Sequence, residues 1–276
     1  MLCGTAQADS LIVTSNRDNT LYEDSGGFLS NGSGTGFFAG TTSSMQIRRG
    51  LVRFDVSAIP TGSTIAGVSM RLRMNRTIAG AQIVSLRRVT ADWGEGISDA
   101  GDPGGGGSAA EPGDATWIHT FYDTQFWTNS GGDFSGVVSA STNVAGTGFY
   151  TWNGAGMVAD VQSWVSGANT NYGWILIGNE TAAGTTKRFA SHEAPAESDW
   201  PLLTIEYTPP QYAVGDMNCD GRVDNFDIDP FVTALTDPDG YAAQYPNCDP
   251  LNADINQDGV VNNFDIDPFV ALLTGG

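Results

Sequence analysis

Two segments near the C-terminus place oxygen-bearing side chains at a spacing that suits a calcium ion. Residues 216–227 have the sequence DMNCDGRVDNFD, and residues 254–265 have the sequence DINQDGVVNNFD. A Ca²⁺ ion takes about six to eight oxygen ligands, which a 12-residue loop supplies from positions 1, 3, 5, 7, 9 and 12 around a glycine at position 6. We therefore expect one calcium ion in each segment.

Each loop offers a complete set of ligands. In loop one they are Asp216, Asn218, Asp220, the Arg222 carbonyl, Asp224 and Asp227. In loop two they are Asp254, Asn256, Asp258, the Val260 carbonyl, Asn262 and Asp265. Loop one has four carboxylates against three, so we expect it to bind calcium more tightly. The alternative is a pair of Asp- and Asn-rich surface turns without an ion, but two loops in register favour calcium.

Both loops belong to a tandem repeat, because residues 216–236 and 254–274 are identical at 15 of 21 positions. The pattern predicts a short helix after each loop, with Pro230 and Pro268 in the first helical turn, where proline is tolerated. We expect most of the repeated apolar side chains to form a small core between the two helices. These are Phe226, Ile228, Phe231, Val232 and Leu235, with Phe264, Ile266, Phe269, Val270 and Leu273.

The N-terminus and the cysteines suggest export. Residues 1–8 end in Ala-Gln-Ala, a small-x-small pattern typical of the end of a signal peptide, so we interpret them as a signal-peptide remnant that includes Cys3. The alternative is an ordinary N-terminus. In a secreted, extracellular protein the remaining pair, Cys219 and Cys248, favours a disulfide, with two reduced thiols as the alternative.

Charge and composition exclude several classes of function. The chain of 276 residues has 31 Asp and Glu against 12 Lys and Arg, a net charge of −19 that disfavours nucleic acid as a partner. No apolar run approaches the about 20 residues of a membrane span. Residues 209–276 hold 12 Asp, no Glu and one Arg, so we expect a domain over 9–208, a linker over 209–213 and a second domain over 214–276.

The first domain is predicted to be mainly β. Its glycines, prolines and short apolar runs fit an antiparallel β-sandwich. Strands are expected at 11–14, 49–56, 67–74, 82–89, 149–152, 172–178 and 202–207. Helical spacing of apolar residues predicts one helix over 156–167, and we expect the glycine-rich stretch 101–113 to be a mobile loop that does not pack.

We expect no enzymatic activity. Only His119 and His192 could serve as imidazole bases, and neither lies in a recognisable motif, so both are interpreted as surface or core residues. Asp92 and Glu95 form the best carboxylate pair for glycoside hydrolysis. The acidic residues around the glycine-rich stretch better suit a solvated face or a third calcium ion in the sandwich; they are Asp92, Glu95, Asp99, Asp102, Glu111 and Asp114.

Sugar binding is a second expectation for the sandwich. Trp117 and Trp127 are candidate stacking platforms, and eight of the twelve basic residues lie between Arg48 and Arg88. Such a strip could bind an acidic polysaccharide, or its arginines could pair with acidic loops. Asn31, Asn75 and Asn179 begin N-x-S/T triplets, a weak signal of glycosylation.

Residues 214–276 resemble a type I dockerin, a duplicated EF-hand-like calcium module that docks onto cohesin β-sandwiches. Both loops, aspartate at position 12 and the helices that follow carry the resemblance. It implies that loop positions 10 and 11 contact the partner, and these are Asn225 with Phe226 and Asn263 with Phe264. The spacer that contains Cys248 is longer than usual, and phenylalanine stands where dockerins have small hydroxyl residues.

Residues 9–208 resemble, more weakly, the exported jelly-roll modules named for a DNRLRE motif, some of which bind acidic polysaccharides. The matching stretches are 49–60, 71–73, 88–93, the predicted helix from 160 to 167 and the closing strand to Tyr207. The motif itself is reduced to SMRLRM at 69–74. This resemblance implies a jelly-roll sandwich before the calcium module.

These patterns together predict a secreted, non-catalytic structural protein. Its calcium module would dock onto a cohesin-like sandwich or onto other subunits, and a head-to-tail contact between copies would give a homo-oligomer or an extracellular filament. The alternative is a carbohydrate-binding module that the dockerin tethers to a separate scaffold.

Overall fold

The computed structural model describes residues 8–210 and 212–274. The expected signal-peptide remnant with Cys3, apart from Ala8, and Gln211 of the expected linker lie outside the described residues. The chain divides into two compact units, and the division after Thr208 coincides with the expected boundary. The larger unit contains Ser63–Thr208 and most of the chain before it, and the smaller unit contains the chain from Pro209 onward.

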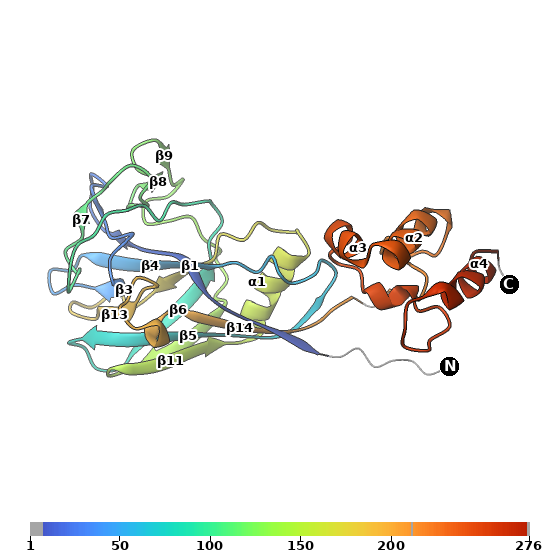
Figure 1. Ribbon diagram of the computed structural model, residues 1–276. Coiled ribbons are helices and arrows are strands. Elements are labelled where there is room, and N and C mark those ends of the chain that lie inside the picture. The colour runs from blue at the N-terminus through green and yellow to red at the C-terminus, as the bar shows by residue number, and fades with distance from the viewer. Residues whose placement is uncertain (1–7, 211, 275–276) are drawn as a thin grey trace. The chain divides into compact units, whose positions relative to one another are not determined.

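The larger unit is built on an antiparallel sheet that folds into two layers, as the sequence predicted (Figure 1). Its described strands follow the order β1-β14-β5-β13-β3-β4-β12-β6-β10, and β11 pairs with β5. Their bounds are β1 Asp9–Tyr22, β3 Gly36–Thr41, β4 Ile47–Phe54, β5 Thr64–Thr77, β6 Gln82–Arg88, β10 Ala140–Val144, β11 Gly148–Asn153, β12 Trp174–Ile177, β13 Lys187–Ala190 and β14 Leu202–Thr208. The first half of β1 pairs with β14 and its second half with β4, so this strand belongs to both layers.

The core between the layers follows from the alternation of side chains along the strands. In β5, Met70, Leu72 and Met74 are buried, whereas Arg71 and Arg73 point to the opposite face. Helix α1 (Ala155–Val165) adds four side chains to the same core, namely Met157, Val161, Trp164 and Val165. The helix predicted from the spacing of these residues is therefore confirmed.

The glycine-rich stretch does pack, so that prediction is wrong. The Tyr22 hydroxyl donates to the Gly104 carbonyl at 2.7 Å, and Arg188 Nε donates to the Pro103 carbonyl at 3.1 Å. Strand β7 (Ser108–Ala109) pairs with β2 (Leu29–Ser30). Because glycine adopts positive φ, as Gly104 does at 74°, the backbone can turn its carbonyls toward these buried donors.

A long connection between β6 and β10 covers part of one sheet and includes the hairpin of β8 (His119–Phe121) and β9 (Gln125–Phe126). Trp93 and Trp127 of this connection pack with Leu51 and Ile175 in a second apolar cluster. The Trp127 ring is buried, and its Nε1 donates to the Thr116 carbonyl at 2.9 Å. Trp127 is therefore no stacking platform, and that expectation is wrong.

The smaller unit contains the two repeats and a spacer. The helices that follow the loops are α2 (Ile228–Thr236) and α4 (Ile266–Thr274), each preceded by a 3₁₀ turn, η2 (Asn225–Asp227) or η4 (Asn263–Asp265). The spacer forms α3 (Pro238–Gln244) and η3 (Pro250–Ala253), and a disulfide joins Cys219 to Cys248. None of the described helices combines the length and the apolar composition of a membrane span.

Candidate metal centres

Loop one is organised around two buried carboxylates. Asp216 accepts hydrogen bonds from the backbone N–H groups of Asp220 and Gly221, at 3.2 and 3.0 Å. Asp227 accepts three more, from Met217 at 2.7 Å, Asn218 at 3.0 Å and Asp224 at 2.8 Å. The first and last positions of the loop therefore hold its backbone in place.

Loop two repeats this arrangement. Asp254 accepts from the backbone of Asp258 at 3.0 Å and of Gly259 at 2.8 Å. Asp265 accepts from Asn256 at 3.1 Å and from Asn262 at 2.9 Å. The glycines at position 6, Gly221 and Gly259, both have φ of 89°, a conformation that a side chain would strain.

The donor set of each loop fits a hard divalent cation. Asp216 and Asp227 are both buried, and burial together with the charge of Asp227 raises the pKa of Asp216. Two buried carboxylates in one small loop repel each other unless a cation lies between them. The side chains of Asn218, Asp220 and Asp224 and the Arg222 carbonyl would supply the remaining oxygens. The equivalent residues of loop two would do the same.

Six of the ten repeated apolar side chains are exposed, so most of them do not form the expected core, and the two phenylalanines at the expected partner-contacting positions are among the exposed ones. Phe226 is 77% exposed and Phe264 is 78% exposed. The core contains Phe231 and Phe269, as expected, and their rings stack with centroids 4.0 Å apart. Beside it, a groove of about 310 Å³ runs between α2 and α4, and the partly exposed Ile228, Val232, Ile266 and Val270 line its walls.

We call Phe226, Phe264 and this groove the docking surface. Each phenylalanine is tied to its loop, because the Phe226 N–H donates to the Asp224 carboxylate at 2.9 Å and the Phe264 N–H donates to the Asn262 side chain at 2.8 Å. Asp224 and Asn262 are also expected calcium ligands. The arrangement therefore links the position of both exposed rings to the expected calcium ligands.

The acidic residues of the larger unit that could hold a third ion do not converge. Asp92 pairs with Arg17 at 3.3 Å, and Asp114 accepts from the backbone of Glu111 at 2.7 Å. Asp102 pairs with Arg188 at 3.4 Å. These three carboxylates therefore have separate partners among the described residues, and a third calcium ion in the sandwich stays a prediction.

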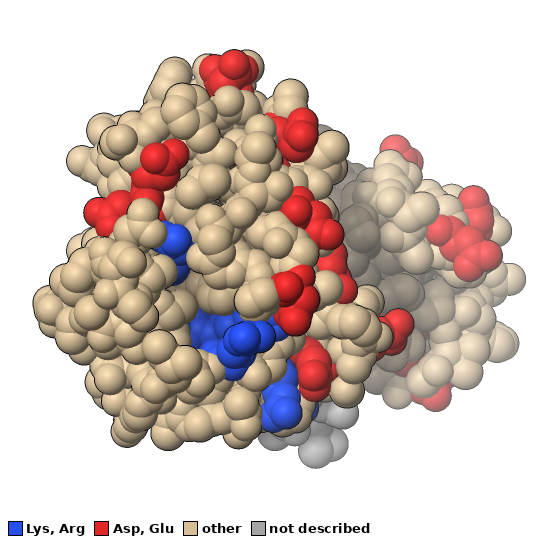
Figure 2. Space-filling view, turned by 90° about the vertical axis from the view of Figure 1, so that its left-hand side faces the viewer, with Lys and Arg blue, Asp and Glu red and all other residues tan. Residues whose placement is uncertain are grey.

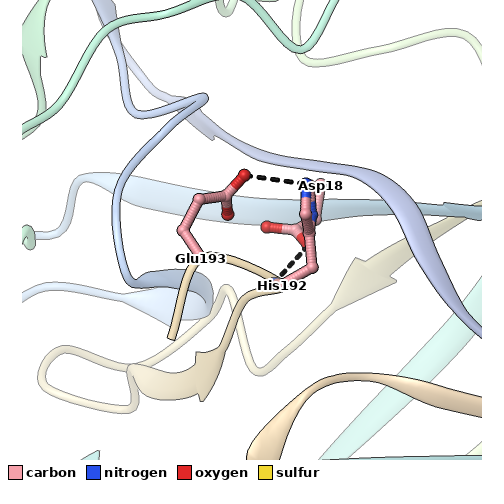
Figure 3. A group of neighbouring side chains, drawn as sticks. All are labelled: Asp18, His192 and Glu193. Carbon is pink, nitrogen blue, oxygen red and sulfur yellow. Dashed lines mark hydrogen bonds and ion pairs between the residues drawn. The ribbon is translucent and has the colours of Figure 1, made fainter. Parts of the chain in front are cut away.

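A different cluster, which the sequence did not reveal, surrounds His192. Its Nδ1 lies 2.9 Å from the carboxylate of Asp18 in β1, and its Nε2 lies 2.8 Å from Glu193 (Figure 3). Glu95 completes the cluster at 3.6 Å from Nδ1 and accepts from the Asp18 N–H at 2.6 Å. These groups come from three distant parts of the chain, so no local motif could have predicted their meeting.

Proton binding explains how this cluster is stable. Burial raises the pKa of Asp18 to about 6 and that of Glu95 to about 8. Burial opposes the charge of His192, but hydrogen bonds to Asp18 and Glu193 raise its pKa to about 10. The imidazolium is therefore the cation that these carboxylates surround, and both of its N–H groups have carboxylate acceptors. The cluster could hold a metal ion only by giving up this arrangement.

We expect the free energy of unfolding of the larger unit to fall by a few kcal/mol as pH rises from about 5 to about 10. Asp18 and Glu95 keep protons in the folded state that the unfolded chain releases near pH 4. Their contribution to the free energy of unfolding therefore decreases above about pH 4, up to about pH 6 for Asp18 and about pH 8 for Glu95. The contribution of His192 is complete below pH 6.5 and is lost as pH rises through about 10. Urea unfolding will measure this through tryptophan fluorescence, because all seven tryptophans precede residue 208.

The control for this pH dependence is His192→Gln, which removes the proton-binding ring and should make the decline above pH 6.5 shallower, with the Glu95 contribution remaining. A wild-type stability that stays constant or rises over this range would contradict the proton distribution in the cluster. An unchanged decline in His192→Gln would contradict the role of His192.

The basic residues of the larger unit are mostly engaged inside it. Arg49 pairs with Glu180 at 2.8 Å and lies over the Trp117 ring at 5.0 Å, and Arg88 pairs with Asp160 at 3.4 Å. On the face shown in Figure 2, the basic side chains gather at a hollow and acidic ones lie around it. Pairing of arginines with acidic groups therefore describes these residues better than a continuous cationic strip.

Two further expectations have structural outcomes. The buried His119 donates or accepts at Thr116 Oγ1 over 2.9 Å, which agrees with its interpretation as a core residue. Asn31 is buried and its Nδ2 donates to the Gly36 carbonyl at 2.9 Å, so its side chain is not accessible for glycosylation in the folded unit.

No protein-family model matches this chain, and no curated protein matches it. The functional argument therefore rests on the two loops, the docking surface and the chemistry of the larger unit.

Proposed function

We propose that the smaller unit is a dockerin-like tandem of EF-hand-like calcium sites, and that the chain is a secreted, non-catalytic assembly protein. The observation that carries this proposal is the repetition of one hydrogen-bond network in two loops, each of which holds an exposed phenylalanine. Calcium would order both loops and so position both rings. Docking would then depend on calcium.

The exposed rings suit protein docking. Large aromatic side chains that are exposed beside an apolar groove are typical anchors of protein interfaces. Phe226 and Phe264 add little to the core of the smaller unit, because both rings are more than three-quarters exposed. Phe231 and Phe269 form that core. In this proposal the larger unit is a jelly-roll module that serves as the structural body, and docking between copies builds an oligomer or an extracellular filament.

We predict that the double variant Phe226→Ala, Phe264→Ala will bind calcium normally but assemble at least about 30-fold more weakly than wild type, because each truncated anchor costs more than about 1 kcal/mol. Sedimentation velocity in calcium measures the assembly, and circular dichroism checks the fold. The matched control is Val137→Ala, which truncates a 71%-exposed side chain of the larger unit. Unchanged assembly of the double variant would exclude these rings from the interface.

One observation favours the alternative function of carbohydrate binding. A hollow of about 590 Å³ lies on the outer face of β6, β10 and β12, lined by polar side chains that include Gln82, Arg87, Asn143 and Asn179. Hydrogen-bonding groups of this kind recognise hydroxyl groups of sugars. A calcium-loaded monomer that binds a polysaccharide, and loses binding in Asn143→Ala, would support this alternative over assembly.

A further inference from the structure

The docking surface belongs to the smaller unit. In the larger unit, one face combines exposed apolar side chains with arginines. Along β1, β14, β5 and β11, cross-strand pairing aligns Thr14, Leu202, Arg71 and Thr151 in one row. The neighbouring pair is Arg73 with Phe149. We call Ile12, Arg71, Arg73, Phe149 and Leu202 the arginine face.

The centre of the arginine face is an aromatic ring that two guanidinium groups contact. Arg71 lies over the Phe149 ring with its Cζ 4.7 Å from the centroid, and Arg73 lies 5.2 Å from the same centroid. Phe149 is 47% exposed and Ile12 is 61% exposed. Arginines stacked in this way lose less side-chain freedom when they bind a partner, which favours binding.

This ring stands apart from the other aromatic rings that pair with arginine in the described chain. Tyr22 and Phe38 are buried beneath Arg48 and Arg188, and Trp117 and Phe134 are partly buried against Arg49. Phe149 alone among these described pairs offers an exposed ring. Among the described residues of the larger unit, the two arginines make only long polar contacts, since Arg71 Nη2 lies 3.4 Å from the Ser198 carbonyl and Arg73 Nε lies 3.9 Å from the Asp199 carboxylate.

The docking surface has the complementary chemistry. Asp229 and Asp267 follow the two exposed phenylalanines by three residues and lie exposed in the first turns of α2 and α4. The segment after residue 208 has 12 Asp against one Arg, so two docking surfaces would repel each other. Two aspartates beside apolar anchors match two arginines beside an exposed ring.

We propose that the docking surface binds the arginine face of a second copy of this chain. This inference rests on the proposed docking function and names its partner. The two surfaces belong to different units of one chain, so the contact is heterologous. Each copy can then bind one neighbour through each surface, and assembly continues as an open chain unless the rotation closes a ring.

A charge exchange tests the pairing. Variant A carries Arg71→Glu and Arg73→Glu, and variant B carries Asp229→Arg and Asp267→Arg. Each variant alone places like charges at every interface, so in calcium we expect each to assemble at least about 100-fold more weakly than wild type. In an equimolar mixture every interface can again join opposite charges, and we expect assembly to return. Arg76→Glu, an exposed substitution on the same strand, is the matched control and should assemble like wild type.

The outcomes separate this inference from the proposed function. Assembly of variant A at wild-type strength, combined with its loss in Phe226→Ala, Phe264→Ala, would overturn the arginine face as partner and leave calcium-dependent docking standing. Assembly retained in the phenylalanine variant would overturn both. Failure of the A and B mixture to assemble would overturn the pairing, provided that both variants keep the circular dichroism and tryptophan fluorescence of wild type. A wild type that stays monomeric in calcium would also overturn it, because a second copy would then not be the partner.

Discussion

Replacing Asp227 with alanine will abolish calcium binding by loop one and unfold the smaller unit. The substitution removes the position-12 ligand and leaves three backbone N–H groups, of Met217, Asn218 and Asp224, without their acceptor. Hydrogen bonds to a charged group contribute about 1.5–3 kcal/mol each, and a domain of this size has only about 3–9 kcal/mol of stability. Calorimetry will then give one calcium ion per chain or none, and far-UV circular dichroism will lose helical signal.

The matched control is Asp229→Ala, which removes an exposed carboxylate two residues away and should leave two calcium ions per chain. Asp265→Ala should affect loop two as Asp227→Ala affects loop one. Since loop one has the extra carboxylate of Asp224, the wild type should fill it first. Two calcium ions with unchanged affinity in Asp227→Ala would contradict the ligand assignment.

Replacing Lys187 with methionine will destabilise the larger unit by about 2–4 kcal/mol and lower its Tm by about 5–15 °C. The Lys187 side chain is fully buried, and its ammonium donates to three backbone carbonyls, of Ala79 at 3.1 Å, Gly80 at 2.7 Å and Ala145 at 2.8 Å. Methionine has similar length but leaves all three carbonyls without this donor. Differential scanning calorimetry in calcium will resolve the change in the larger unit.

Lys187→Arg provides the control for charge. A planar guanidinium cannot reproduce three donors that radiate from one atom, so we expect it to destabilise the unit as well, although it keeps the positive charge. Lys187 is the single lysine of the chain, and the other eleven Lys and Arg residues are all arginine. The geometry of its three contacts gives a reason why this one position has lysine. A Lys187→Met variant as stable as wild type would show that the three contacts contribute nothing.

The parts of the molecule that depend on local spacing could be predicted from the sequence. The ligand pattern of loop one lies within twelve consecutive residues, and the core side chains of α1 recur at helical intervals from Met157 to Val165. The strands were located less accurately, and β1 extends over Asp9–Tyr22 where only its first part was expected. Its second half is mostly polar in sequence, yet Asp18 and Asn19 are buried, because this half pairs with β4 and both residues bond to Glu95 of the long connection between β6 and β10.

Features that depend on tertiary contacts could not be predicted. Asp18 and His192 are 174 residues apart, and their neighbours in sequence contain no motif that brings them together. Trp127 lies outside every strand and helix that the sequence predicted, yet it packs in the second apolar cluster of the larger unit. Phe226 and Phe264 repeat with the same period as the core residues, so periodicity alone could not separate exposed anchors from buried ones.

Sedimentation velocity of the full chain in calcium and in excess chelator tests calcium-dependent docking most directly. Calcium should give species larger than a monomer that grow with protein concentration, and chelation should return the protein to a monomer whose tryptophan fluorescence still reports a folded larger unit. A monomer under both conditions at high concentration, or oligomers that persist in chelator, would contradict the account.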